Sequence, residues 1–167
     1  PDPRGPAIRI TVYQDADHAH DMLTRGSVSV ILLFLNNTPI KWITKRQKTV
    51  ETSTYGSELV SAKIATELIL EYRYSLRVMG VLLDGPALLI GDNNSIVLNC
   101  TMPSSVLKKK HNACAYHRVR EAIAAGIMKF THIASKYNYA DILTKPLPNT
   151  SFHRLLKPLL FRDPTHF

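Results

Sequence analysis

The sequence contains few cysteines and no long apolar run. Its 167 residues include two cysteines, Cys100 and Cys114, which do not form a CxxC pair. This excludes a disulfide-rich scaffold and favours a reducing compartment. No apolar run reaches the roughly 18 residues that a membrane-spanning helix needs, because charged side chains interrupt even the stretch 59–79. No signal peptide is recognisable, so we expect neither a membrane protein nor a secreted one.

Acidic residues are also scarce. Asp and Glu number 13 against 21 Lys and Arg, which gives a net charge of +8 and a pI of about 9.6. This balance favours a polyanionic partner, with nucleic acid first and an anionic membrane surface second, although some basic domains are merely soluble. With 45% hydrophobic residues, the chain fits one domain better than two. Because it begins at Pro1 rather than Met, we expect a segment of a longer protein.

Hydrophobic periodicity predicts an α/β fold. Strands are expected at 7–13, 27–35, 40–45, 86–91 and 127–133, and helices at 52–80, 93–99, 112–126 and 137–145. Short connections join the first three strands, and helical crossovers join the later ones. We therefore predict a five-stranded mixed sheet, three antiparallel strands then two parallel, flanked by helices. The expected domain is 8–147, with a linker at 1–7 and a C-terminal tail at 148–167 that has room for a short helix.

Four carboxylates fall where this sheet would build a site. Asp15 follows the first strand, Glu58 lies in the first turns of the long helix, Asp92 ends the fourth strand, and Asp141 lies near the start of the last helix. Strand ends and helix starts are where α/β domains place ligands, and carboxylate oxygens are the ligands that Mg²⁺ prefers. Asp92 and Asp141 could each simply cap a helix. Four such acids in a basic protein favour a metal site.

Several segments resemble the ribonuclease H domain of copia-type retrotransposon polyproteins. The matching segments, in the order found in that family, are DADHAHD, PIKWITKRQKTVETSTYGSELVSA, GDNNSIVLN, KKKHNACAYHRVREAI and YADILTKPL. The resemblance implies the ribonuclease H fold and Mg²⁺-dependent cleavage of the RNA strand of RNA–DNA hybrids. It also implies that Asp15, Glu58, Asp92 and Asp141 hold two Mg²⁺ ions, with Mn²⁺ as a substitute. Asp17 is a rival to Asp15, because both have the same strand parity.

The resemblance also implies partners and a cellular setting. The expected partners are an RNA–DNA hybrid and the reverse transcriptase domain of the same polyprotein, in the cytoplasm, a virus-like particle or the nucleus. A non-catalytic nucleic-acid-binding or structural remnant of the same fold is the second hypothesis. An integrase-type polynucleotidyl transferase is the third, and it is disfavoured because its site would not need Glu58 on the helix after the third strand.

Basic clusters and neighbouring polar residues are candidates for contact with nucleic acid. Lysines position a duplex through its phosphates, and amides or hydroxyls can bond the RNA 2′-OH. The candidates are Lys45, Lys48, Asn93, Ser95, Lys108, Lys109 and Lys110. Trp42 is expected to pack in the core. His111, Cys114 and His117 have a spacing that suggests zinc, but on a helix they would not converge and a fourth ligand is missing.

Overall fold

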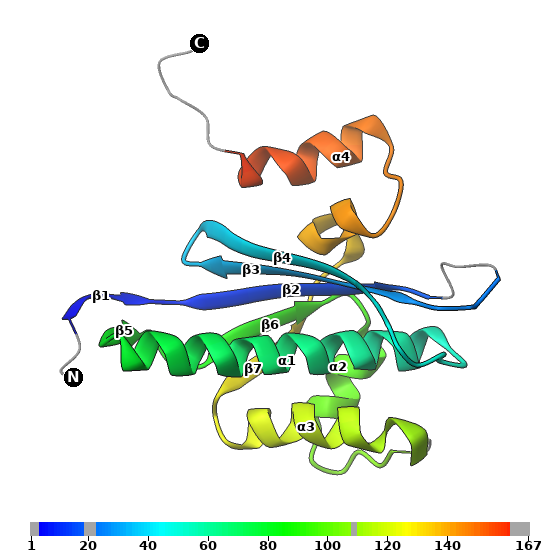
Figure 1. The fold of residues 1–167 in the computed structure, drawn as a ribbon, viewed down its shortest axis with the longest axis horizontal. Coiled ribbons are helices and arrows are strands. Elements are labelled where there is room, and N and C mark those ends of the chain that lie inside the picture. The colour runs from blue at the N-terminus through cyan, green and yellow to red at the C-terminus, as the bar shows by residue number, and fades with distance from the viewer. Residues whose placement is uncertain (1–3, 19–22, 108–109, 161–167) are drawn as a thin grey trace.

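The structure, a computed structural model, describes residues 4–18, 23–107 and 110–160. Its main sheet has five strands in the order β4-β3-β2-β6-β7 (Figure 1). The strands β2 (Ile10–Asp17), β3 (Val28–Leu35) and β4 (Thr38–Arg46) are antiparallel, and β6 (Ala87–Gly91) and β7 (Met128–His132) extend the sheet with parallel pairing. The predicted α/β architecture with a mixed five-stranded sheet is confirmed.

Helices cover one face of the sheet and bury the main core. The helices α1 (Thr54–Val78), α2 (Asn94–Thr101) and α3 (Ala113–Ala124) lie on this face (Figure 1). Alternation along β2 and β3 places Val12, Ile31 and Leu33 against α1, where Leu59 and Ile69 complete the core. The side chain of Ser53 caps α1 by accepting a hydrogen bond from the Gly56 N–H.

The other face carries shorter helices. A 3₁₀ helix, η3 (Tyr139–Leu143), contacts β2 and β3, and α4 (Asn149–Leu156) packs on η3. Further 3₁₀ turns are η1 (Lys110–Asn112), η2 (Ser135–Tyr137) and η4 (Lys157–Leu159). The segment 137–145, predicted as one helix, instead contains the end of η2 and the 3₁₀ helix η3. Asn138 separates the two with extended backbone and caps η3 through its side chain.

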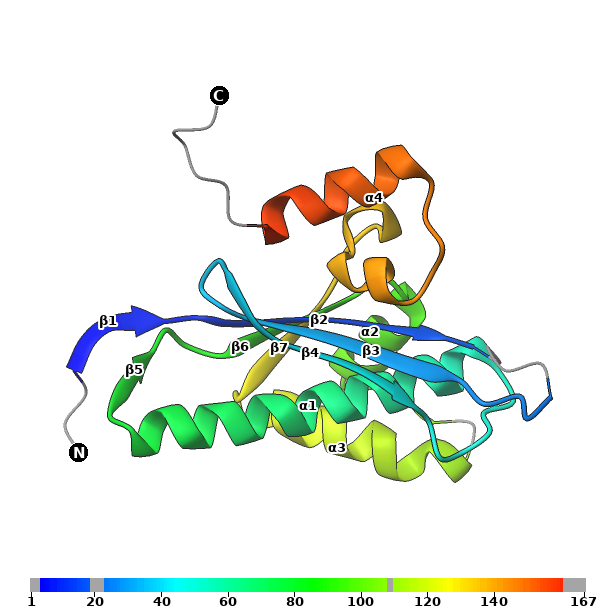
Figure 2. The ribbon, with the colours of Figure 1, turned by 45° about the horizontal axis from the view of Figure 1, so that its top comes forward.

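A small second sheet lies beyond the main one. The strand β1 (Arg4–Ile8) pairs in parallel with β5 (Val81–Leu83), at the end of the molecule where α1 finishes (Figure 2). Arg9 closes this sheet through two hydrogen bonds, at 3.1 and 2.5 Å, from its guanidinium to Asp84 Oδ2. The segment 1–7, predicted as a linker, thus includes most of a strand. None of the helices in the described parts of the chain is long and apolar enough to span a membrane.

The prediction that Trp42 lies in the core is wrong. Its side chain is 68% exposed. Trp42 pairs with Leu32 on the edge strand β4, on the face away from α1, and the described residues leave most of its ring exposed there. The alternation of side chains along a strand predicts which face of the sheet a residue lies on, but it does not predict whether another element covers that face.

Arg120 on α3 holds the end of α2. Its guanidinium donates hydrogen bonds to the carbonyl oxygens of Asn99, Met102 and Pro103 at 2.8–3.1 Å, and it lies 5.2 Å from the centre of the Tyr116 ring. The carbonyls at a helix C-terminus have no partner within the helix. Arg120 therefore acts as a C-terminal cap supplied by a different helix.

We expect Arg120→Ala to lower the free energy of unfolding by about 1–3 kcal/mol, because carbonyls at a partly buried helix end lose a charged donor. Urea denaturation measures the change. Arg118→Ala is the matched control, since Arg118 lies on the same helix and makes a 4.0 Å exposed ion pair with Glu121. It should cost less than about 0.5 kcal/mol, and equal losses in the two variants would contradict the capping role.

Candidate functional site

Three carboxylates from distant parts of the sequence meet at one end of the sheet. Asp15 lies in β2, Glu58 in the second turn of α1, and Asp92 directly after β6. One carboxylate oxygen from each lies within 4.8 Å of the other two, and no other such cluster of three His, Cys, Asp or Glu occurs in the described residues. The structure therefore brings together three of the four acids that the sequence singles out.

Local packing explains the position of these carboxylates. The Ser61 hydroxyl, one turn after Glu58, donates to the Asp15 carbonyl at 2.9 Å and so ties α1 to β2. Before Asp92, a Cβ on Gly91 would lie 2.5 Å from Nε2 of the buried Gln14 side chain, so a larger residue here would have to displace that side chain. Strand, helix and sheet contacts thus fix the backbone beneath each acid.

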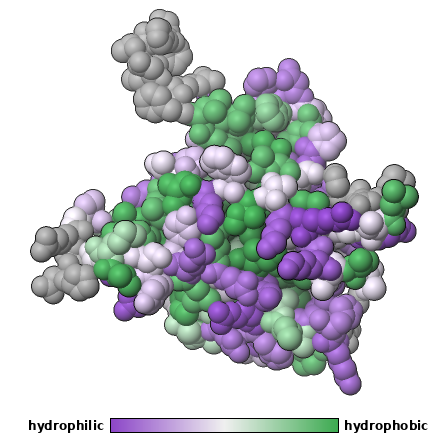
Figure 3. All heavy atoms as spheres, in the orientation of Figure 1, coloured by the Kyte–Doolittle hydropathy of each residue, from purple (hydrophilic) through white to green (hydrophobic). Residues whose placement is uncertain are grey.

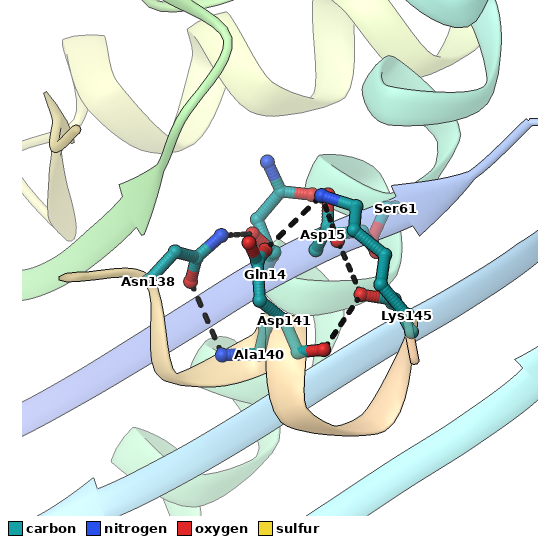
Figure 4. A network of polar contacts seen from close by, with 8 residues as sticks. Gln14, Asp15, Ser61, Asn138, Ala140, Asp141 and Lys145 are labelled. Carbon is teal, nitrogen blue, oxygen red and sulfur yellow. Dashed lines mark hydrogen bonds and ion pairs between the residues drawn. The ribbon is translucent and has the colours of Figure 1, made fainter. Parts of the chain in front are cut away.

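Asp141, the fourth acid, lies close by but outside the group of three. It sits in η3, on the opposite face of the sheet from α1. The turn is anchored to β2 because the Asn138 amide donates to the Gln14 carbonyl at 3.1 Å. Asp141 is buried, and its Oδ1 lies 3.3 Å from the ammonium of Lys145, four residues later (Figure 4).

Two residues that the sequence reasoning missed connect Asp141 to the group of three. The Thr144 hydroxyl donates to Asp15 Oδ2 at 2.6 Å, and Lys145 Nζ lies 3.2 Å from the same oxygen. Figure 4 shows the Lys145 side chain reaching to both aspartates. The spacing between Asp141 and Lys145 in YADILTKPL was the available signal, since residues four apart share one face of a helical turn.

Burial and crowding shift the pKa values of these groups strongly. Burial, together with the charges of Asp15 and Asp92, raises the pKa of Glu58 to about 9. Burial and the Asp15 charge raise the pKa of Asp141 to about 7, although Lys145 opposes this shift. Burial also disfavours the charged form of Asp15, but the hydrogen bond from Thr144 and the charge of Lys145 outweigh it and lower its pKa. The two aspartates likewise outweigh burial and raise the pKa of Lys145.

The residues fit a divalent cation. Asp15 Oδ1 and Glu58 Oε2 are buried without a hydrogen-bond partner, and a polar oxygen in that state is costly. A cation would pair with both oxygens and relieve the repulsion that raises the pKa of Glu58. The three side chains offer only oxygen atoms, the ligand type suited to Mg²⁺ or Mn²⁺. Asp17, the rival of Asp15, lines the same pocket but does not belong to the group of three.

The carboxylates lie in an open pocket of about 560 Å³. Asn93, Asn94 and Ser95 form part of its wall at the start of α2. Asn93 also caps that helix, since its Oδ1 accepts from the Ile96 N–H at 3.4 Å. Asn93 therefore caps a helix and lines the pocket at the same time. His132, at the end of β7, lies beside the pocket with Nε2 3.1 Å from the Asp92 carbonyl oxygen.

The structure describes three of the five lysines that are candidates for contact with nucleic acid. Lys45, Lys48 and Lys110 are exposed, whereas Lys108 and Lys109 lie outside the described residues. Hydrophilic residues gather over the end of β4 that leads to α1, and hydrophobic ones gather around α4 (Figure 3). In place of a zinc cluster, His111 forms a 3.6 Å ion pair with the buried Glu51 when its ring is protonated.

Comparisons with known proteins identify relatives along most of the chain. It is 30% identical over 149 residues to the retrovirus-related Pol polyprotein from transposon RE1 of Arabidopsis thaliana, and 28% over 156 residues to that from transposon RE2. These matches cover 89% and 93% of the chain but only 10% and 11% of the polyproteins. The chain thus spans about a tenth of the length of these relatives. No family model matches it.

Solved structures share the fold at low sequence identity. An N-terminal ribonuclease H domain from Mycobacterium tuberculosis aligns with a TM-score of 0.61 and 10% identity, over 90% of this chain and 98% of that one. LC11-RNase H1, solved in complex with an RNA/DNA hybrid, aligns with a TM-score of 0.59 and 13% identity, over 78% and 88% of the two chains. The predicted ribonuclease H-like fold is confirmed. We conclude that the chain is similar to a segment of the retrovirus-related Pol polyproteins of transposons and that it has the ribonuclease H fold.

Proposed function

We propose that this chain is an endoribonuclease that hydrolyses the RNA strand of RNA–DNA hybrids with the help of a divalent cation. One observation carries the proposal: Asp15, Glu58 and Asp92 converge within 4.8 Å of one another in an open pocket. The net charge of +8 favours a nucleic-acid substrate. The relatives are Pol polyproteins, and one protein of the same fold has been solved with an RNA/DNA hybrid.

The proposed chemistry divides between the cation and the chain. A bound Mg²⁺ or Mn²⁺ would lower the pKa of a water ligand and stabilise charge on the scissile phosphate. The carboxylates of Asp15, Glu58 and Asp92 would hold that cation, and no side chain needs to attack the phosphate. Thr144 fixes the orientation of Asp15 by donating to its Oδ2. Asp15 and Asp141 are the residues that would hold the second ion implied by the family resemblance.

Substrate contacts would come from the surroundings of the pocket. The exposed lysines Lys45, Lys48 and Lys110 are proposed to contact phosphates, which positions a duplex without reading its sequence. Asn93 and Ser95 line the pocket and offer polar groups for the 2′-OH that distinguishes RNA from DNA. In a polyprotein, the chain would act with a reverse transcriptase domain and degrade the copied RNA template, inside a cell or a virus-like particle.

The test is a cleavage assay with the full 167-residue chain. A labelled RNA–DNA hybrid, the same RNA single-stranded, and the matching RNA–RNA and DNA–DNA duplexes are incubated with Mg²⁺, with Mn²⁺ or with EDTA. We expect cuts only in the RNA of the hybrid, with 3′-hydroxyl ends. Cutting should stop in EDTA and return with excess Mg²⁺, because the carboxylates need a cation to act.

Hybrid binding, measured in the same buffers by fluorescence anisotropy, is the control. Binding should weaken steeply as salt rises, since phosphate contacts release counterions. If the chain binds the hybrid but cuts it with neither metal, the non-catalytic nucleic-acid-binding hypothesis replaces the proposal. Cutting that persists in EDTA would contradict the role of the carboxylate group.

A further inference from the structure

A second pocket, of about 380 Å³, lies on the face of the sheet that η3 contacts. The described residues that line it all differ from those of the carboxylate pocket. Among them are three aromatic residues and two amides: Tyr13, Phe34, Tyr139, Asn36 and Asn37. Pockets that bind small ligands are typically clefts of about 300–1,000 Å³ with aromatic walls and a few polar groups. The size and the lining of this second pocket therefore suit a small, flat ligand.

Three aromatic rings form one wall of this pocket. The centre of the Tyr139 ring lies 4.7 Å from that of Tyr13 and 5.9 Å from that of Phe34. Tyr13 and Phe34 meet edge to face, with their centres 5.6 Å apart. Contacts of this kind hold each ring in a defined orientation. Because Tyr13 and Tyr139 are only partly buried, part of each ring stays open to the pocket.

The polar groups of this pocket are available to a ligand. In the described parts of the chain, neither the two tyrosine hydroxyls nor the Asn37 amide makes a hydrogen bond. Burial, and then the neighbouring Tyr139, raises the pKa of Tyr13 above its ordinary value of 10, so its hydroxyl stays protonated and can donate. An amide offers both donors and an acceptor. A ligand with a flat apolar face and a polar edge would use the rings and these groups together.

The chain connects this pocket closely to the carboxylate site. Tyr13 lies two residues before Asp15 on the same face of β2, about 7 Å away by the rise of a strand. Tyr139 lies two residues before Asp141 in η3. A nucleic-acid strand held at the carboxylates would therefore reach the pocket within a few nucleotides.

We propose that this second pocket binds an unpaired nucleobase of the RNA strand, where that strand continues beyond the hybrid as a single strand. The base would stack on the rings of Tyr13 and Tyr139, and its edge would bond to their hydroxyls and to the Asn37 amide. A paired base cannot bind in this way, because its partner occupies its edge. The inference rests on the proposed function, which places the RNA strand at the carboxylates.

Charge and chemistry favour a nucleobase as the ligand. No charged side chain is among the described residues that line the pocket, which suits an uncharged, flat group. The net charge of +8 attracts the phosphates that carry such a group. Tyrosine rings accept any of the bases, because every base has a π face. The pocket would therefore recognise the presence of an unpaired base and not its sequence.

Binding of the full chain in EDTA tests the proposal without relying on cutting. Fluorescence anisotropy compares a hybrid whose RNA strand carries a short single-stranded extension with the same hybrid carrying an abasic extension, which keeps every phosphate. Extensions at the 3′ end and at the 5′ end are tested in separate substrates. We expect the bases to tighten binding about tenfold at one of these ends. Bases on an extension of the DNA strand should bring no such gain.

Variants of the pocket should remove this gain. Tyr139→Leu deletes one stacking ring, and Thr11→Phe fills the pocket from β2, so both should lose most of the gain. Tyr139→Phe should keep the larger part of it, because stacking needs the ring. Tyr137→Leu is the matched control, since Tyr137 is an exposed tyrosine of η2 outside the pocket, and it should keep the whole gain. Circular dichroism checks the fold of each variant.

A photo-crosslink gives a second measurement that needs no variant. An iodouridine in the RNA extension should crosslink to Tyr13 or Tyr139 of the wild-type chain, as identified by mass spectrometry. A crosslink found only outside the pocket would overturn the inference.

The outcomes separate this inference from the proposed function. If bases bring no gain at either RNA end, or only on the DNA strand, the inference is wrong, and cutting of the blunt hybrid still supports the proposed hydrolysis. A full gain in folded Tyr139→Leu and Thr11→Phe would overturn it as well. If the gain appears as expected but no hybrid is cut with Mg²⁺ or Mn²⁺, the proposed function fails and the pocket belongs to a non-catalytic nucleic-acid-binding domain.

Discussion

Asp92→Asn is expected to reduce cutting of the hybrid by about 10³-fold, because losing a charged ligand removes several kcal/mol of charge stabilisation in the transition state. Asparagine has nearly the same shape, and the contact of His132 with this residue uses the Asp92 carbonyl oxygen of the backbone. The fold should therefore survive. Single-turnover cutting with excess protein measures the loss, and thermal unfolding in EDTA checks the fold.

Asp84→Asn provides the matched control. Asp84 is an exposed aspartate that pairs with Arg9 beside the small sheet, at the far end of α1 from the pocket. This variant should cut at the wild-type rate. If Asp92→Asn also cuts at that rate, Asp92 is a helix-flanking residue and not part of the chemistry. A loss that appears in both variants would point to a general effect on the preparation.

Glu58→Gln is expected to reduce cutting of the hybrid about as much as Asp92→Asn does. We also expect this variant to be more stable than the wild type at alkaline pH when no metal is bound. The folded pKa of Glu58 is about 9 against an ordinary value of 4.5, mainly because the group is buried and then because Asp15 and Asp92 are near. Between those pH values the folded state keeps a proton that the unfolded chain releases. The stability that depends on this proton is complete below about pH 4.5 and is lost as pH rises through 9.

The measurable quantity is the slope of the free energy of unfolding against pH, in EDTA. One retained proton gives a fall of about 1.4 kcal/mol per pH unit. Asp141 contributes in the same direction up to about pH 7, so the interval from pH 7 to 9 isolates Glu58. The wild type should lose stability across that interval, and Glu58→Gln should lose much less because its amide does not ionise.

Glu67→Gln is the control on the same helix. Glu67 pairs with Lys63 one turn away at 3.3 Å, and both side chains are partly exposed. This substitution should leave the wild-type slope and the cutting rate unchanged. A Glu58→Gln variant that retains the full slope would show that another group, and not Glu58, holds the proton.

Much of the architecture could be predicted from local sequence. Alternation in β2, the apolar run of β3 and the length of α1 were sufficient to predict a mixed sheet flanked by helices, because these elements bury one continuous face. The pair of β1 and β5 was missed. Its strands are short, and they pair across more than 70 residues, so nothing local in either segment indicates the partner.

The site could be predicted less completely than the fold. The acids Asp15, Glu58 and Asp92 stand at strand ends and a helix start, where the topology of the sheet brings them together. Asp141 was predicted from the family motif as an equal fourth ligand. Its partner, Lys145, was not identified, because a lysine near an acid on a short helix is usually an ordinary surface pair. Only the tertiary contact with Asp15 distinguishes it.

Thr144 and Lys145 clamp Asp15 by contacting its Oδ2, and their place in the sequence determines when a newly made chain can complete the carboxylate site. Thr144, which donates to Asp15, is 129 residues away from it in the sequence. A ribosome therefore produces all five strands of the main sheet, the last of which ends at His132, before it reaches Thr144 and Lys145. A stop codon in the short interval between His132 and Thr144 would spare every sheet strand and yet remove both clamping residues. A chain truncated at that point would form the sheet strands with an Asp15 that lacks both contacts.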